Sequence, residues 1–211
     1  MQLNGIAITK SFCYIFSKMR GKKNKLKNLI VYILAEYNNS NLTETKLQKL
    51  LYFCDFGCYE ISGQSITGFK YKKNHYGPTI NNLAKYLKEL KDEGYIEIIE
   101  GKTPYGSPKK TFAVKRSLGN FREIFSDLEL KTIDDINNAY AGLKPKEISD
   151  LSHTDFPYLA TNDSEEIDYN LVNYREDEEV ATVKEDYSAF SSEEFSNTVS
   201  KFAKTLQDNG S

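Results

Sequence analysis

A long amphipathic helix between Thr43 and Gly63 constrains the fold more than any other feature of this sequence. Thr43 is a suitable N-cap, and Leu42 can reach Leu47 as a hydrophobic staple. Gly63 supplies a stop. The helix carries one apolar stripe at a spacing of three and four residues: Leu47, Leu50, Leu51, Cys54, Cys58 and Ile61. Such a stripe requires other elements to cover it, which favours a helical core.

Four further helices follow from the same periodicity. They are expected at about 25–37, from the pair Gly77-Pro78 to about 93, from the capping-box sequence that begins at Ser126 to about 140, and over a short stretch from Lys144-Pro145 to about His153. The Gly77-Pro78 helix is expected to direct these apolar residues inward: Ile80, Leu83, Ala84, Leu87 and Leu90.

A β-hairpin completes the predicted domain. Residues 95–100 alternate like a strand, the loop 101–108 is rich in turn residues, and residues 111–114 can return as the partner strand. The predicted fold class is therefore α+β and mainly α-helical: a compact helical domain with a small, wing-like hairpin and an acidic C-terminal extension.

Charge divides the chain into three parts. The sequence has 211 residues and a net charge of only −2, so overall basicity gives no argument for nucleic acid. Residues 1–35 nevertheless hold seven Lys/Arg and no acid, whereas 163–211 hold thirteen Asp/Glu against four Lys/Arg. We expect a basic arm at 1–21, the folded domain at 22–160 and an acidic extension at 161–211, with one amphipathic helix at about 192–206.

The cysteines and the apolar runs indicate the cellular compartment and whether the chain spans a membrane. The odd number of cysteines, Cys13, Cys54 and Cys58, does not suit a disulfide framework, and the apolar run 11–16 is too short to span a membrane. We expect a cytoplasmic protein without a membrane partner.

No catalytic, metal or cofactor site is predicted. Cys54 and Cys58 could supply two zinc ligands, but a zinc site normally needs three or four. A Cys–His pair with His75 or His153 lacks any supporting local signature, and apolar cysteines are more often inert. Gly57, Gly63 and Gly68 do not have the spacing of a phosphate-binding loop.

The stretch SITGFKYKKNHYGPTI, residues 65–80, is the candidate contact surface. Phe69, Tyr71 and Tyr76 are large amphipathic side chains that suit a protein interface, and lysines and His75 can form its rim. Tyr71 or Tyr76 could equally pack on the domain core. Gly77 is expected to be an extended N-cap, so that Gly77→Ala would be mild.

The order of the elements also fits a winged helix-turn-helix that binds nucleic acid. The hairpin region carries Lys102, Lys109, Lys110, Lys115 and Arg116, which could contact phosphates. The third helix mixes lysines with acids, which is typical of an ordinary solvated face. Nucleic acid is therefore not the primary partner predicted.

Four short motifs resemble one known family. They are residues 46–56 (KLQKLLYFCDF), residues 65–68 with Tyr71, the Tyr76-Gly-Pro78 triplet, and residues 148–153 (ISDLSH) followed by Tyr158. In this order, over about 26–160, they resemble the Panacea or SocA-like antitoxin domain. Cys54 and Tyr158 stand where that family usually has a small alanine-like residue and a tryptophan.

The resemblance implies a non-enzymatic bacterial or phage antitoxin that binds the toxin encoded beside it. Some relatives act as adaptors that deliver the toxin to a cellular protease, so a protease is a second candidate partner. No cofactor is implied. The expected partner-binding residues are Phe69, Tyr71, His75, Tyr76, Gly77, Pro78, His153 and Tyr158.

The acidic extension has two interpretations. Its acids alternate with apolar residues between Ile167 and Tyr174, so the segment could become ordered on a basic toxin surface. It could equally be a solubilising tail.

Overall fold

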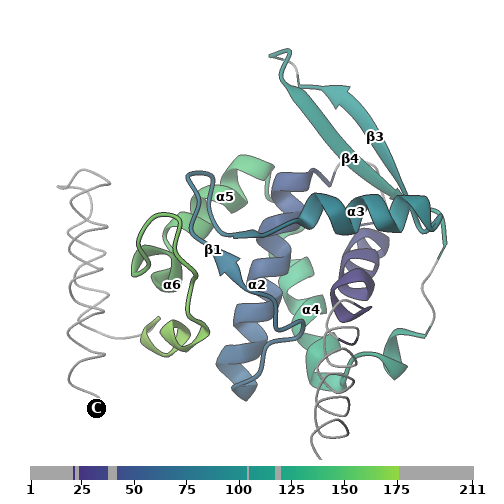
Figure 1. Cartoon of the computed structure of the whole chain (residues 1–211). Coiled ribbons are helices and arrows are strands. Elements are labelled where there is room, and N and C mark those ends of the chain that lie inside the picture. Colours follow the sequence, from purple (N-terminus) through teal and green to yellow (C-terminus); the bar gives the residue numbers. More distant parts are fainter. Residues whose placement is uncertain (1–20, 22–23, 38–41, 104, 117–119, 176–211) are drawn as a thin grey trace, which may run out of the picture.

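The computed structural model describes residues 21, 24–37, 42–103, 105–116 and 120–175 (Figure 1). Helix α2, Glu44–Ser62, runs through the centre of the domain, and almost every side chain from Lys46 to Phe56 is buried. Both predicted ends are confirmed: the Thr43 hydroxyl accepts a hydrogen bond from the Lys46 amide, and Gly63 adopts a φ of 69°. The prediction for Ile61 is wrong, because the last turn of α2 is exposed.

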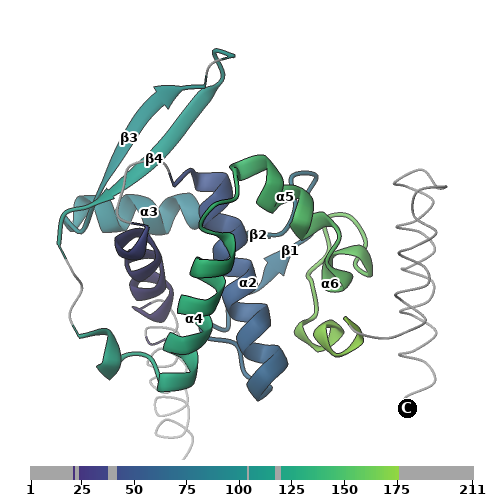
Figure 2. The ribbon, with the colours of Figure 1, turned by 180° about the vertical axis from the view of Figure 1, so that it is seen from behind.

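Other helices cover α2, as predicted. One helix occupies residues 24–36, and α4, Asp127–Tyr140, begins with the expected capping box between Ser126 and Glu129. Helix α5, Pro145–His153, has Pro145 in its first turn, and the short α6, Phe156–Leu159, follows it. Helices α4 and α5 both pack against α2 (Figure 2).

The predicted helix start at Gly77-Pro78 is wrong. Gly77 has a φ of 91°, which is left-handed and not extended. The residues after it form strand β2, Thr79–Ile80, which pairs antiparallel with β1, Tyr71–Lys72. Helix α3, Leu83–Asp92, begins only after Asn82. Leu83, Leu87 and Leu90 are buried as expected, but Ala84 lies at the edge of this stripe and is exposed.

The predicted hairpin is present and projects from the helical domain beyond α3 (Figure 1). Strands β3, Ile96–Lys102, and β4, Pro108–Val114, pair antiparallel from Ile96 opposite Val114 to Lys102 opposite Pro108. Phe112 is buried at the base, whereas Tyr105 at the tip is 95% exposed. The expected fold class, α+β and mainly helical with a small hairpin, is confirmed.

Residues 161–175, which we assigned to the acidic extension, pack on the domain and do not form a solubilising tail. Ile167, Leu171 and Val172 are buried, the last two in the 3₁₀ helix η2, Tyr169–Tyr174. The Arg175 guanidinium binds both carboxylate oxygens of Asp155, at 3.0 and 2.9 Å. These apolar side chains are therefore not free to become ordered on a partner, because they already pack on the domain.

Some predicted parts lie outside the described residues. They are the basic arm up to residue 20 and the acidic segment 176–211 with its expected helix at 192–206.

A shorter 3₁₀ helix, η1, Phe121–Glu123, precedes α4. None of the described helices is long and apolar enough to cross a membrane.

Candidate partner-binding surface

The loop of residues 73–78 connects β1 to β2 and is held by side chains from three helices. Its turn is closed by a hydrogen bond of 2.8 Å from the Gly77 amide to the Asn74 carbonyl. Side chains then contact four of its backbone carbonyls: Tyr158 Oη on Asn74 O at 2.9 Å, His153 Nε2 on His75 O at 3.2 Å, Ser149 Oγ on Tyr76 O at 3.2 Å and Lys49 Nζ on Pro78 O at 3.0 Å. The backbone of this 73–78 loop is therefore fixed from outside the loop.

Gly77 allows the loop to approach the helices closely. A Cβ atom on Gly77 would lie 2.6 Å from Ser152 Oγ and 2.7 Å from Lys49 Nζ. Its φ of 91° is also one that side chains with a Cβ rarely adopt. The expectation of a mild Gly77→Ala substitution is therefore wrong, for steric and conformational reasons.

Lys49 is the least expected of the residues that contact the 73–78 loop. The side chain is only 1% exposed, and its ammonium group donates to the Pro78 carbonyl. Burial lowers the pKa of Lys49 to about 7, because charging an amine away from water is costly. The amine thus anchors β2 to α2 at a point where no carboxylate is paired with it in the described contacts.

A second buried polar contact fixes the strand before the loop. Asp55 on α2 accepts hydrogen bonds from the Thr67 amide and from the Tyr71 hydroxyl, both at 2.7 Å. Burial raises the pKa of Asp55 to about 6, and these hydrogen bonds act in the opposite direction by stabilising the carboxylate. Asp55 thereby ties residues 65–71 to the central helix.

These contacts bring together the four sequence motifs noted above. Lys49 and Asp55 come from the first, Thr67 and Tyr71 from the second, Gly77 from the third, and the fourth supplies Ser149 and His153. The family description "Antitoxin SocA-like, Panacea domain" matches residues 47–157, and every residue just named lies within this segment. The chain belongs to this SocA-like antitoxin family. A search among curated proteins found no match.

The expected contact residues on and before the 73–78 loop fall into an exposed and a buried group. Tyr76 is 75% exposed and His75 is also exposed; their rings meet edge to face at 4.9 Å. Tyr71 is fully buried, and so are Gly77 and Pro78. Of the two outcomes left open for the tyrosines, Tyr71 is a core residue and Tyr76 is a surface residue. The expectation that Tyr71 faces a partner is wrong, because its hydroxyl is bound to buried Asp55.

The other expected residues support the loop or the core. Phe69 is half-buried and packs edge to face on Tyr86. Tyr158 is buried, and the Lys73 ammonium lies 4.8 Å from its ring centre. His153 is half-buried, with a pKa lowered mainly by burial and also by the charge of Lys49. Each of these three side chains contacts other residues of the domain: Phe69 packs on Tyr86, and His153 packs on Tyr158.

Cys54 and Cys58 are the two cysteines within the described residues, and neither has the environment of a reactive thiol. Cys54 and Cys58 are free and buried, and burial raises the pKa of both thiols, which disfavours the reactive thiolate. Within the described part of the chain, no three His, Cys, Asp or Glu side chains are grouped so that they could hold a metal ion.

Several charges on and near the hairpin are already engaged. Lys115 pairs with Glu97 at 2.5 Å, and Arg116 donates to the Glu93 carbonyl at 2.8 Å. On α3, Lys88 pairs with Asp92 at 2.6 Å. The carboxylates of Glu97 and Asp92 partly offset the charges of Lys115 and Lys88, which a nucleic-acid surface would need.

Sequence reasoning missed Lys49, Asp55, Thr67 and Ser149. One signal could have found the first two. Residues 50–56 of α2 are apolar all round apart from Asp55, which predicts a fully enclosed helix. A lysine and an aspartate on an enclosed helix must find polar partners, because unpaired buried charges are costly.

Proposed function

We propose that this protein neutralises a cognate toxin by binding it directly, without enzymatic activity, and that the 73–78 loop is the centre of the contact. The observation that carries the proposal is a large, 75% exposed tyrosine, Tyr76, on a backbone fixed by Lys49, Ser149 and His153. An exposed tyrosine on a rigid loop suits an interface anchor, because little conformational entropy is lost on binding.

The test is the affinity for the toxin encoded by the neighbouring reading frame. Tyr76→Ala should weaken toxin binding by about 1–3 kcal/mol and reduce the protection of cells, as for an anchor residue. The melting temperature should stay nearly constant, since surface substitutions change stability little. The matched control is Tyr105→Ala, which removes a 95% exposed tyrosine from the hairpin tip.

The comparison of the two tyrosines can contradict the proposal. If Tyr76→Ala still protects cells from the toxin and Tyr105→Ala does not, the toxin contact lies on the hairpin and not on the 73–78 loop. Tight binding to the upstream DNA that weakens steeply with salt would instead favour the winged-helix alternative.

Delivery to a protease is a separate mode of the same contact. If the protein only blocks its toxin, the half-life of the toxin in cells should not shorten when the antitoxin is co-expressed. A shortened half-life that requires one cellular protease would identify the adaptor mode. Both modes need the contact through Tyr76, so the variant above applies to each.

A further inference from the structure

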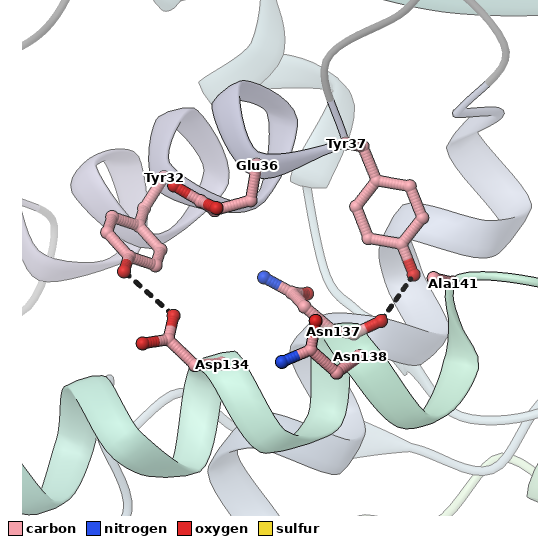
Figure 3. A pocket seen from close by; sticks show the side chains of 7 residues that line it. All are labelled: Tyr32, Glu36, Tyr37, Asp134, Asn137, Asn138 and Ala141. Carbon is pink, nitrogen blue, oxygen red and sulfur yellow. Dashed lines mark hydrogen bonds between the residues drawn. The ribbon is translucent and has the colours of Figure 1, made fainter.

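A cavity of about 460 Å³ lies between the helix of residues 24–36 and α4 (Figure 3). It shares no residue with the 73–78 loop. Its lining residues are Tyr32, Glu36, Tyr37, Asp134, Asn137, Asn138 and Ala141. Six of these seven side chains are polar, so the cavity is suited to a polar ligand rather than to an apolar one.

Asn137 is the feature that points to a ligand. Its side chain is only 5% exposed, and neither its amide oxygen nor its amide nitrogen has a hydrogen-bond partner. Figure 3 shows the amide rising from α4 between Tyr32 and Tyr37, toward the opposite helix. A buried amide without partners lowers stability, and its terminal torsion is soft enough to turn either atom toward an incoming group.

The two charged side chains that line the cavity are carboxylates, and the positive charge of Arg122 also acts on the Tyr32 hydroxyl from nearby. Asp134 accepts one hydrogen bond, from the Tyr32 hydroxyl at 2.8 Å, and Glu36 is exposed at the rim. No lysine or arginine is among the lining residues. Lys46 packs behind the cavity, 4.8 Å from the centre of the Tyr37 ring, and donates to the carbonyls of Ala141 and Leu143.

The two phenols act as fixed donors and flat walls. The Tyr37 hydroxyl donates to the backbone carbonyl of Asn137 at 3.3 Å. Both phenols are therefore hydrogen-bonded to α4 (Figure 3). Burial raises the pKa of Tyr37 to about 12, and burial together with the nearby carboxylate raises the pKa of Tyr32. The phenols therefore stay neutral and add no negative charge, while their faces favour a flat cation.

We propose that this cavity binds a guanidinium group. A guanidinium is planar, permanently charged and has five donors, which match the Asp134 and Glu36 carboxylates and the amide oxygen of Asn137. The group can come from a small metabolite or from an arginine side chain of a bound protein. This site is independent of the proposed docking through Tyr76.

The probe is agmatine, titrated into the full chain at low salt and followed by NMR shifts or calorimetry. Saturable binding is expected, and it should weaken as salt rises because the attraction is ionic. The matched control ligand is N-carbamoylputrescine, which keeps the ammonium end of agmatine but replaces the guanidinium by a neutral urea. We expect it to bind at least tenfold more weakly.

Three variants test the assignment of residues. Asn137→Leu, which conserves the approximate volume, and Asp134→Asn should each weaken agmatine binding at least tenfold. Glu36→Gln changes an exposed side chain and so keeps the test valid if a core variant does not fold. Tyr76→Ala is the control that should leave agmatine binding unchanged.

Three results would overturn the proposal. The first is no saturable binding of agmatine to the wild-type chain, and the second is equal binding by wild type and the Asn137→Leu and Glu36→Gln variants. The third is equal affinity for the neutral urea, which would reject the guanidinium. Competition then identifies the source: displacement of the toxin by agmatine indicates an arginine of the toxin, and simultaneous binding indicates a free ligand. The Tyr76→Ala experiment fails or succeeds separately, so the two proposals are distinguishable.

Discussion

Two regions bury polar groups beside the same helical core, and they differ in whether those groups have partners. Around the 73–78 loop, Lys49, Ser149 and Tyr158 each donate to a backbone carbonyl. In the cavity beside Tyr32 and Tyr37, both amide atoms of Asn137 lack a partner. Partnered groups fix a backbone, whereas an unpartnered group lowers stability until a ligand supplies its hydrogen bonds. The two regions should therefore respond to substitution with opposite signs.

The largest effect is expected at Gly77. Gly77→Ala adds a Cβ that would lie within 3 Å of Ser152 and Lys49, at a φ of 91°. We expect a loss of about 2–4 kcal/mol in the free energy of unfolding, since strain and overpacking add. Chemical denaturation measures it. Gly142→Ala, a position with open space around it, is the control; a loss equal to that control would show that the loop does not need its close approach.

The next effect is a pH dependence due to Lys49. Its pKa is about 7 in the folded protein but that of an ordinary lysine, about 10.4, in the unfolded chain. Between these values the unfolded chain binds more protons, so this group makes stability rise with pH, by at most about 1.4 kcal/mol per pH unit.

The measurement is the free energy of unfolding of wild type and Lys49→Met at pH 6, 7, 8 and 9. The free energy of unfolding of wild type should rise relative to that of Lys49→Met from pH 7 upward. Below pH 7 the difference between the two proteins should stay nearly constant. Lys85→Met, which replaces an exposed lysine on α3, controls for net charge. Parallel curves for Lys49→Met and wild type would mean that the Lys49 amine titrates normally.

A smaller loss is expected for Ser149→Ala. It removes the hydroxyl that binds the Tyr76 carbonyl, a bond of 3.2 Å, which should cost about 1 kcal/mol of stability. Toxin binding should weaken as well, because the loop that carries Tyr76 becomes less ordered. Ser107→Ala, an exposed position on the hairpin, should change neither quantity. If Ser149→Ala binds the toxin as tightly as wild type, the order of the 73–78 loop does not contribute to toxin affinity.

An effect of similar size, and the only gain, is expected for Asn137→Leu in the absence of ligand. Replacing a buried amide without partners by an apolar side chain of similar size should raise stability by about 1 kcal/mol. Thermal unfolding measures it, with Asn173→Leu, an exposed position that does not line the cavity, as the control. A loss of stability would show that the amide is already satisfied, and the contrast between the two regions would disappear.

The sequence alone determined most of the secondary structure. The caps at Thr43, Gly63 and Ser126 and the alternation in residues 95–100 predicted the helix ends and the hairpin, because each depends on residues within a few positions of one another. The order of four short motifs also identified the family. These are local signals, and they persist whatever packs around them.

Only the tertiary structure decided how the motifs are used. Gly77-Pro78 has the local signature of a helix start, but the pairing of Thr79–Ile80 with Tyr71–Lys72 and the hydrogen bonds from Lys49 and Ser149 impose a turn instead. In the sequence, Tyr71 and Tyr76 are equally good candidates for a surface contact. The structure separates them, because the Tyr71 hydroxyl donates to buried Asp55, sixteen residues earlier in the chain. Such choices depend on partners distant in the chain, and a periodic pattern carries no information about which partner is opposite.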